Sequence, residues 1–164
     1  MALISLQSSL GATARFRQRG VAAIEFALVF SLLFLVTYAL ATFGAALYVQ
    51  QVVSRAAEDG ARAAALLPQP PSSANVKQVV VESLAQSFIV PTSVGADMTT
   101  RRSWISNHTT IAPCTSATGA TSCVVTVTYP YTGDARLLPW IPLVDASNWI
   151  KQLRSSATAA LKTP

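Results

Sequence analysis

The chain has 164 residues, of which 51% are apolar and only 12% charged, so it can hold one small domain and an anchor but not two full domains. The formal net charge is +5, and Arg15, Arg17 and Arg19 supply three of these charges. After Gly20, nine basic residues stand against seven acidic ones without a basic stripe of interleaved aromatics, which argues against nucleic acid as a partner.

A long apolar run follows the basic segment formed by residues 1–20. No charged residue occurs from Phe26 to Ser54, and the 24 residues from Phe26 to Val49 exceed the roughly 20 that cross a bilayer core. The Leu, Val and Phe residues favour insertion by about 3 to 6 kcal/mol, which outweighs the cost of Glu25 at the edge of the run. A removed secretory signal peptide is the alternative, but its apolar region would span only about 7 to 15 residues. The run therefore predicts a membrane-spanning helix.

The basic residues indicate how this helix is oriented. Three arginines precede the run without an acidic residue among them, whereas Arg55 and Arg62 beyond it are matched by Glu58 and Asp59. Because an excess of Lys and Arg marks the cytoplasmic flank of a span, we expect a cytoplasmic N-terminus and an exported C-terminal part.

The helix is predicted to continue beyond the membrane, so that it covers residues 21–67. Residues 50–67 are rich in alanine, and the first proline after them is Pro68. Gly60 costs about 1 kcal/mol relative to alanine inside a helix, and close packing against another helix or the exported domain would compensate. Helix propensity alone is the alternative explanation of the small residues, which recur at helical spacing: Val53, Ala56, Ala57, Gly60, Ala61 and Ala64.

Residues 68–75 are predicted to form a linker, and residues 76–164 the exported domain. Its first element is a predicted helix over 76–90, which Pro91 ends. Ser72, Ser73 and Asn75 are the candidate N-caps. The residues expected to point inward from this helix are Val76, Val79, Val80, Leu84 and Phe88.

Strands are predicted in the rest of the exported domain. Residues 99–111 alternate in a polar, Thr-rich pattern, and residues 123–131 place Val125, Val127 and Tyr129 on one face. Residues 149–162 are ambiguous, because their propensity suits a helix while their alternation suits a strand. The alternating residues are Leu153, Ser155, Ala157, Ala159 and Leu161.

Cys114 and Cys123 enclose a segment of glycine and small polar residues that suits a hairpin loop. Two nearby cysteines are compatible with a disulfide or with two inert thiols, and an exported location favours the disulfide. Such a bond would stabilise the domain by about 2 to 3 kcal/mol in the chain-entropy model. His108 is the only histidine, so a metal site is not expected. Without a hydrolase, phosphate-loop or zinc-protease motif, we expect neither an enzyme nor a cofactor.

One motif joins the basic segment to the apolar run: RGVAAIEFALVFSLLFLV, in which Gly20 is followed five residues later by Glu25 and then by Phe26. With the later stretch FGAALYVQQVVSRAAEDGARAAA, this motif resembles the N-terminal segment of TadE-like proteins, the minor pseudopilins of the tight-adherence (Tad) branch of type IV pili. The resemblance covers about residues 17 to 66. It extends loosely to VVTVTYPY and SSATAAL, which favours a strand over 149–162.

The resemblance implies an α+β fold, in which a long N-terminal helix leads into a small exported domain with a helix and an antiparallel sheet of about three strands. It also implies a prepilin-type leader, which an aspartyl prepilin peptidase of the inner membrane would cut between Gly20 and Val21. Glu25 would then pair with the new amino terminus of a neighbouring subunit, beside Phe26. The implied partners are the inner membrane, other Tad pilins and pseudopilins, and the Tad inner-membrane assembly platform, with the C-terminal domain in the periplasm and incorporation in the pilus left open.

Two alternatives remain at this point. Glu25 could be an interfacial carboxylate that reaches to the lipid headgroups. The chain could also be an uncleaved, single-pass accessory subunit of a secretion or transport complex, in which case Gly20 would stay joined to Val21. The mass of the mature N-terminus separates cleavage from an intact chain.

Overall fold

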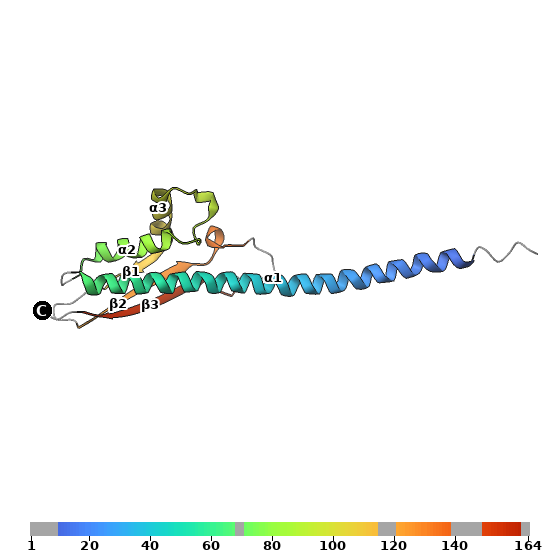
Figure 1. The fold of residues 1–164 in the computed structure, drawn as a ribbon, viewed down its shortest axis with the longest axis horizontal. Coiled ribbons are helices and arrows are strands. Elements are labelled where there is room, and N and C mark those ends of the chain that lie inside the picture. Colours follow the sequence, from blue (N-terminus) through green and yellow to red (C-terminus); the bar gives the residue numbers. More distant parts are fainter. Residues whose placement is uncertain (1–9, 68–70, 115–120, 139–148, 162–164) are drawn as a thin grey trace, which may run out of the picture. The chain divides into compact units, whose positions relative to one another are not determined.

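The computed structural model describes residues 10–67, 71–114, 121–138 and 149–161, with side chains from residue 20 onward (Figure 1). The chain divides into an N-terminal unit, Met1–Leu40, and a C-terminal unit, Ala41–Pro164. One helix, α1 (Leu10–Leu66), runs through both units. It contains no proline, and it begins within the predicted leader and ends one residue before the predicted end at 67.

A three-stranded antiparallel sheet forms one layer of the C-terminal unit. Its strands are β1 (Thr110–Ala112), β2 (Ser122–Pro130) and β3 (Gln152–Ala160), in the order β1-β2-β3. Central strand β2 pairs with β3 along its whole length, from Ser122 opposite Ala160 to Pro130 opposite Gln152. The expected α+β class with about three antiparallel strands is confirmed. Within the ambiguous segment 149–162, Gln152–Ala160 forms strand β3, the alternative that the resemblance favoured.

The core lies where the sheet meets the helices. In β2, Val125, Val127 and Tyr129 are fully buried on one face, as the alternation predicted. The Tyr129 hydroxyl donates toward the carbonyl oxygens of Ile89, at 3.1 Å, and Ala135, at 3.2 Å. Burial raises the pKa of the Tyr129 phenol far above its usual value, so the side chain stays neutral and keeps its proton for these bonds.

The small-residue face of α1 packs inside the C-terminal unit. Its members are buried: Val53, Ala56, Ala57, Gly60, Ala61 and Ala64. A Cβ atom added at Gly60 would lie 2.5 Å from Val80 Cγ2 and 3.2 Å from Val125 Cγ1, which is too close for a side chain. Gly60 therefore lets α1 approach both α2 and β2, and this contact is the compensation that the sequence called for. Polar contacts follow the same face, since the Ser54 and Ser155 hydroxyls lie 2.8 Å apart.

Helix α2 (Ser73–Ala85) begins inside the predicted linker and ends five residues before the predicted end. Ser72 occupies the N-cap position but makes no side-chain capping bond. Val76, Val80 and Leu84 are fully buried as expected. The prediction for Phe88 was wrong: α2 has ended before it, the helical repeat no longer applies, and the side chain is 84% exposed. Val79, which was also expected to point inward, is 38% exposed.

The predicted strand over 99–111 was wrong for most of its length. Residues Met98–His108 form helix α3, and only Thr110–Ala112 joins the sheet. Asp97 is the cause, because its carboxylate accepts hydrogen bonds from the Thr100 amide and hydroxyl, each at 2.9 Å, and so caps the helix. These bonds lower the pKa of Asp97 below its usual value.

Arginine side chains join α3 to α2. Arg101 Nε donates to the Ala85 carbonyl at 2.7 Å, and a terminal nitrogen donates to that of Ser87, so this guanidinium satisfies carbonyls at the end of α2. Arg102 forms an ion pair with Glu82, through two hydrogen bonds that lower the pKa of Glu82. The remaining elements are two short 3-10 helices, η1 (Thr92–Val94) and η2 (Gly133–Ala135).

Candidate functional site: the apolar part of α1

In the N-terminal unit, α1 presents large apolar side chains to its surroundings. Every residue from 20 to 37 is exposed. Apolar side chains that are at least 60% exposed in this stretch are Ile24, Phe26, Leu28, Val29, Leu32 and Leu33. Within the described residues, Gly20–Leu66 is the one helical stretch long and apolar enough to cross a membrane. This surface is consistent with a single-pass anchor.

The predicted processing site lies at the start of this exposed stretch. A Cβ atom at Gly20 would meet no other atom within 4 Å, and Val21 is 57% exposed. The described part of the chain therefore leaves the bond between Gly20 and Val21 uncovered. Among the described residues, none comes close enough to Gly20 to require a glycine there, in contrast to Gly60.

Glu25 is exposed one turn further along α1. No described side chain forms an ion pair or hydrogen bond with its carboxylate. An unpaired carboxylate is costly in an apolar environment, so a cationic partner would stabilise Glu25 there. Its exposed side chain is accessible to such a partner from outside the described part of the chain.

Phe26 begins a row of aromatic residues that the sequence analysis missed. The Phe26 and Phe30 rings stack at 5.9 Å between centroids, and the Phe34 and Tyr38 rings stack at 6.2 Å. Because all four residues are spaced at i,i+4, they follow one ridge of the helix surface. Such ridges are the units that interdigitate when helices pack, and the spacing of the aromatics was the signal that could have revealed this one.

The polar residues of the apolar stretch are satisfied within the helix. The Ser31 hydroxyl donates to the Ala27 carbonyl at 2.7 Å, and the Thr37 hydroxyl donates to the Leu33 carbonyl at 2.8 Å. Because these hydroxyls already have partners four residues back, they add little to the cost of transferring α1 into lipid.

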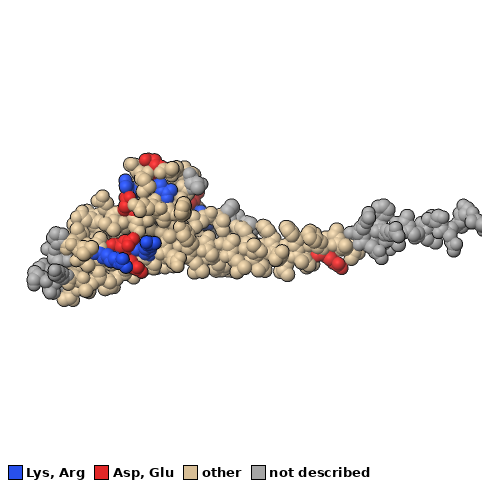
Figure 2. Space-filling view, viewed as in Figure 1, with Lys and Arg blue, Asp and Glu red and all other residues tan. Residues whose placement is uncertain are grey.

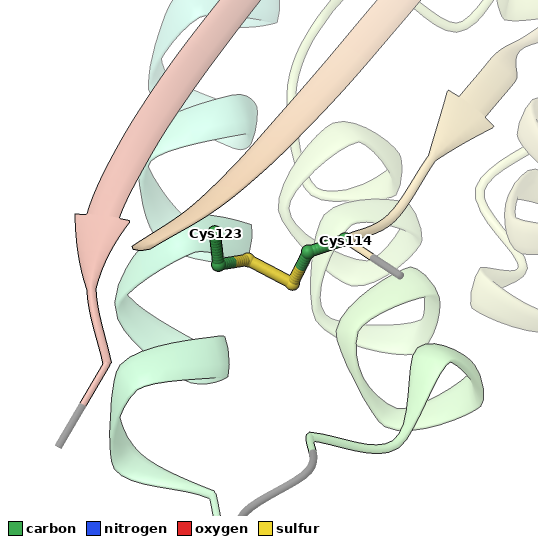
Figure 3. The surroundings of a disulfide bond; sticks show 2 residues. All are labelled: Cys114 and Cys123. Carbon is green, nitrogen blue, oxygen red and sulfur yellow. A yellow bond between two sulfur atoms is a disulfide. The ribbon is translucent and has the colours of Figure 1, made fainter. Parts of the chain in front are cut away.

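In the C-terminal unit, Cys114 and Cys123 are joined by a disulfide (Figure 3). Figure 3 shows the bond linking the segment that follows β1 to the start of β2. The two Cα atoms lie 5.2 Å apart, and both cysteines are buried. The hairpin segment between them, residues 115–120, lies outside the described residues.

The described residues hold no group of three His, Cys, Asp or Glu side chains that could bind a metal ion. His108 lies exposed at the end of α3, where its ring stacks on Trp104 at 4.3 Å. Figure 2 shows acidic and basic side chains lying together on one face of the C-terminal unit rather than in patches of one sign.

Comparison with known proteins supports this view of α1. The model of the family described as TadE-like protein matches residues 20–62. The match begins at Gly20, includes Glu25, and covers both the exposed and the packed part of the helix. No curated protein and no solved structure matches the chain. The resemblance seen in the sequence is thus confirmed over most of α1.

Proposed function

We propose that this chain, TadE-like over residues 20–62, is a minor pseudopilin needed to assemble a Tad (type IVc) pilus. The observation that carries the proposal is the family match, because it begins at the predicted cleavage residue and includes the acid at the start of the apolar helix. The function is association: α1 joins other pilins and pseudopilins, and the exported α+β domain, residues 76–164, provides a surface for recognition. No step requires an active site or a cofactor.

Maturation is the first step of this proposal. An aspartyl prepilin peptidase cuts between Gly20 and Val21, removes the basic leader at residues 1–20, and leaves Val21 as the first residue. Two features support the cut: three arginines precede Gly20, and no described atom would contact a side chain at that position.

Glu25 then serves as the pairing charge. Cleavage creates a positive α-amino group at the head of an apolar helix, and Glu25 becomes the fifth residue of the mature chain. Its exposed carboxylate has no described partner, so it can neutralise the amino group of a neighbouring subunit. Because either charge alone is expensive in lipid, the pair selects one register between helices, and the carboxylate also complements the helix dipole. Phe26 and its aromatic row provide the adjacent packing surface.

The proposed setting is the bacterial inner membrane. The N-terminus lies in the cytoplasm and the domain that follows residue 67 lies in the periplasm, where an oxidising environment would maintain the bond between Cys114 and Cys123. From there the chain would meet the inner-membrane assembly platform and join the base, tip or body of the pilus.

Mass spectrometry of the mature N-terminus tests the cleavage. We expect a chain that begins at Val21 when the peptidase is present and one that retains the leader when it is absent. The matched variants are Gly20→Leu and Gly44→Leu, since neither glycine has a described atom within 4 Å of an added Cβ. The first should block cleavage and the second should not. An uncut wild-type chain in both samples would overturn the proposal and favour the uncleaved accessory subunit.

Substitution of Glu25 tests the pairing separately. Glu25→Ala should insert and be cleaved normally but fail to support piliation, because the amino terminus of the neighbour loses its counter-charge. Glu25→Asp retains the charge on a shorter side chain and should restore part of the piliation. Normal piliation by Glu25→Ala, scored by electron microscopy, would rule out the pairing role while leaving the cleavage intact.

A further inference from the structure

Four aromatic side chains are exposed near the N-terminal end of the C-terminal unit. They are Phe43 and Tyr48 of α1, Phe88 after α2, and Trp149 before β3, and together we call them the aromatic collar. Phe88 and Trp149 are 84% and 70% exposed, whereas Phe43 and Tyr48 are 39% and 36% exposed. Single exposed apolar residues are ordinary, whereas four exposed aromatics from three separate segments of one unit are unusual.

The structure groups these residues in two pairs beside α1. The Phe43 and Trp149 rings lie 6.1 Å apart between centroids. Phe88 and Tyr48 line one surface groove together with Val52, and the same groove continues past Arg55 to Glu58 and Asp59. The collar therefore surrounds the stretch of α1 from residue 43 to residue 52, where Leu47 is also 69% exposed.

This level follows directly after the length of helix that a bilayer core takes up. About 20 residues cross the core, so a span that begins at residue 21 to 26 ends near residue 41 to 46. The first charged residue after Glu25 is Arg55, about 18 Å beyond Phe43 at 1.5 Å per residue. The two collar residues of α1, Phe43 and Tyr48, are separated by about 7.5 Å of helix, which is comparable with the roughly 5 to 8 Å that a headgroup region adds on each side of the core.

The residue types fit a lipid headgroup region better than a second protein surface. Trp and Tyr concentrate at membrane interfaces, because their apolar rings sit among the acyl chains while their N–H and O–H groups reach water. Lys151, two residues after Trp149, and Arg154 are both exposed and could meet lipid phosphates. In the sequence, Phe43 and Tyr48 also fall inside the candidate membrane-crossing stretch, Gly20–Leu66.

We infer that the aromatic collar is a second membrane contact, through which the C-terminal unit rests in the exported-side headgroup region of the bilayer that α1 spans. Trp149 and Phe88 are the residues that enter the lipid from outside α1. The contact holds the exported domain in one orientation against the membrane until the subunit leaves for the pilus. The inference rests on the anchored state of the proposed function, but not on cleavage at Gly20 or pairing at Glu25.

Tryptophan quenching tests this inference on the full chain. The reporter variant carries Trp104→Phe and Trp140→Phe, so that Trp149 alone emits, in vesicles of phosphatidylethanolamine and phosphatidylglycerol. The matched control carries Trp104→Phe, Trp140→Phe, Trp149→Phe and Leu66→Trp, which places one tryptophan at a position of 87% exposure near the opposite end of the unit. Lipids with a spin label near the headgroup quench rings at the interface, whereas iodide quenches rings in water.

We expect headgroup-labelled lipid to quench Trp149 at least threefold more than the tryptophan at position 66, and iodide to show the reverse order. Equal quenching of both positions by iodide, without quenching by lipid, would overturn the inference. Trp149 could instead be protected from both quenchers, with the protection lost when the protein is diluted in lipid. That result would also overturn the inference, because it would show that a second copy of the chain covers Trp149. Resistance to alkaline extraction reports on the anchor separately, so a chain that stays in the membrane with an iodide-quenched Trp149 would refute only the collar contact.

Discussion

The two parts of α1 follow opposite rules of side-chain size. From residue 21 to residue 40 the large apolar residues are exposed, with Ile24 and Phe26 at 70% and Leu40 at 71%. From residue 46 to residue 64 the buried residues are small, and Ala56 and Ala64 are completely inaccessible. The first part thus exposes large apolar side chains all around the helix, whereas the second part buries a face of small ones, although both belong to one helix.

This difference in side-chain size indicates what each part of α1 packs against. Large exposed side chains at every turn suit lipid or the helices of other subunits, which can adapt to them. Small buried side chains bring the helix backbone close to α2 and β2, where a larger side chain would have no room. The first part should therefore tolerate changes of apolar side chain that the C-terminal unit does not.

The largest expected effect comes from shortening a leucine in each environment. Leu84 is fully buried in the core, so Leu84→Ala should lower the free energy of unfolding of the C-terminal unit by about 2 to 5 kcal/mol. Leu33 is 63% exposed in the apolar part of α1, and Leu33→Ala should leave that free energy unchanged. Thermal unfolding of the full chain in detergent, followed by near-UV circular dichroism, measures both. Similar losses of unfolding free energy in the two variants would show that the two leucines do not lie in different environments.

Breaking the disulfide should come next in size. Cys114→Ser with Cys123→Ser removes a cross-link of sequence separation 9, which is worth about 2 to 3 kcal/mol in the chain-entropy model. We expect the C-terminal unit of the double variant to unfold at a lower denaturant concentration than the wild type. The helical signal that remains after unfolding, from the apolar part of α1, should not change. A wild-type chain treated with reductant is the control and should behave like the double variant. An unchanged midpoint in both would contradict the structural role of the bond.

The sequence predicted those elements whose pattern is set by one periodic face. β2 alternates cleanly, and α1 is a long apolar helix followed by alanines, so each was recognisable without its partners. β3 also alternates, but its helix-forming residues left it ambiguous until the resemblance favoured a strand. Gly60 was identified because its cost in a helix requires a reason, and that reason is the close approach of Val80 and Val125.

The errors arose where a single capping or ending contact outweighs propensity. The β-branched threonines before Arg101 suggested a strand, but the Asp97 cap three residues before Thr100 starts a helix there. The end of α2 was placed at Pro91, whereas Arg101 binds the carbonyls of Ala85 and Ser87 from another helix. A contact between distant residues leaves no local pattern, so that boundary could not have been found, but the Asp97 cap could.

A smaller change in stability is expected from alanine substitutions at two glycines of α1. Alanine gains about 1 kcal/mol over glycine in a helix interior, so Gly44→Ala should stabilise slightly or leave stability unchanged, since the site is open. At Gly60 the new Cβ would lie 2.5 Å from Val80 Cγ2, and overpacking of about 1 to 3 kcal/mol should outweigh the gain. Thermal unfolding of the two variants should shift in opposite directions. A stabilised Gly60→Ala variant would show that α1 is not closely packed there.

The smallest expected effect concerns acid, and it falls on the C-terminal unit alone. Hydrogen bonds lower the pKa of Glu82 and of Asp97 below their ordinary values of 4.5 and 3.8 in the folded chain. A carboxylate with a depressed folded pKa adds stability above its unfolded pKa, and that stability is lost as the pH falls through the folded value. Unfolding should therefore become easier from about pH 5 down to pH 3. The effect is small because Glu82 and Arg102 remain open to water, where salt screens the pair.

Matched variants separate these carboxylates from the other acids of the unit. Glu82→Gln and Asp97→Asn together should lower stability at pH 7 and flatten its acid dependence, whereas Glu58→Gln removes an exposed carboxylate of α1 and should leave the slope as it is. Urea unfolding of the full chain in detergent at pH 3, 4, 5 and 7 gives the slopes. The membrane part of α1 contains only Glu25 as an acid, and Glu25→Gln should not alter the profile of the C-terminal unit. If Glu25→Gln changed that profile as much as the double variant, the two parts of α1 would be coupled in stability, and the contrast in their packing would not extend to their energetics.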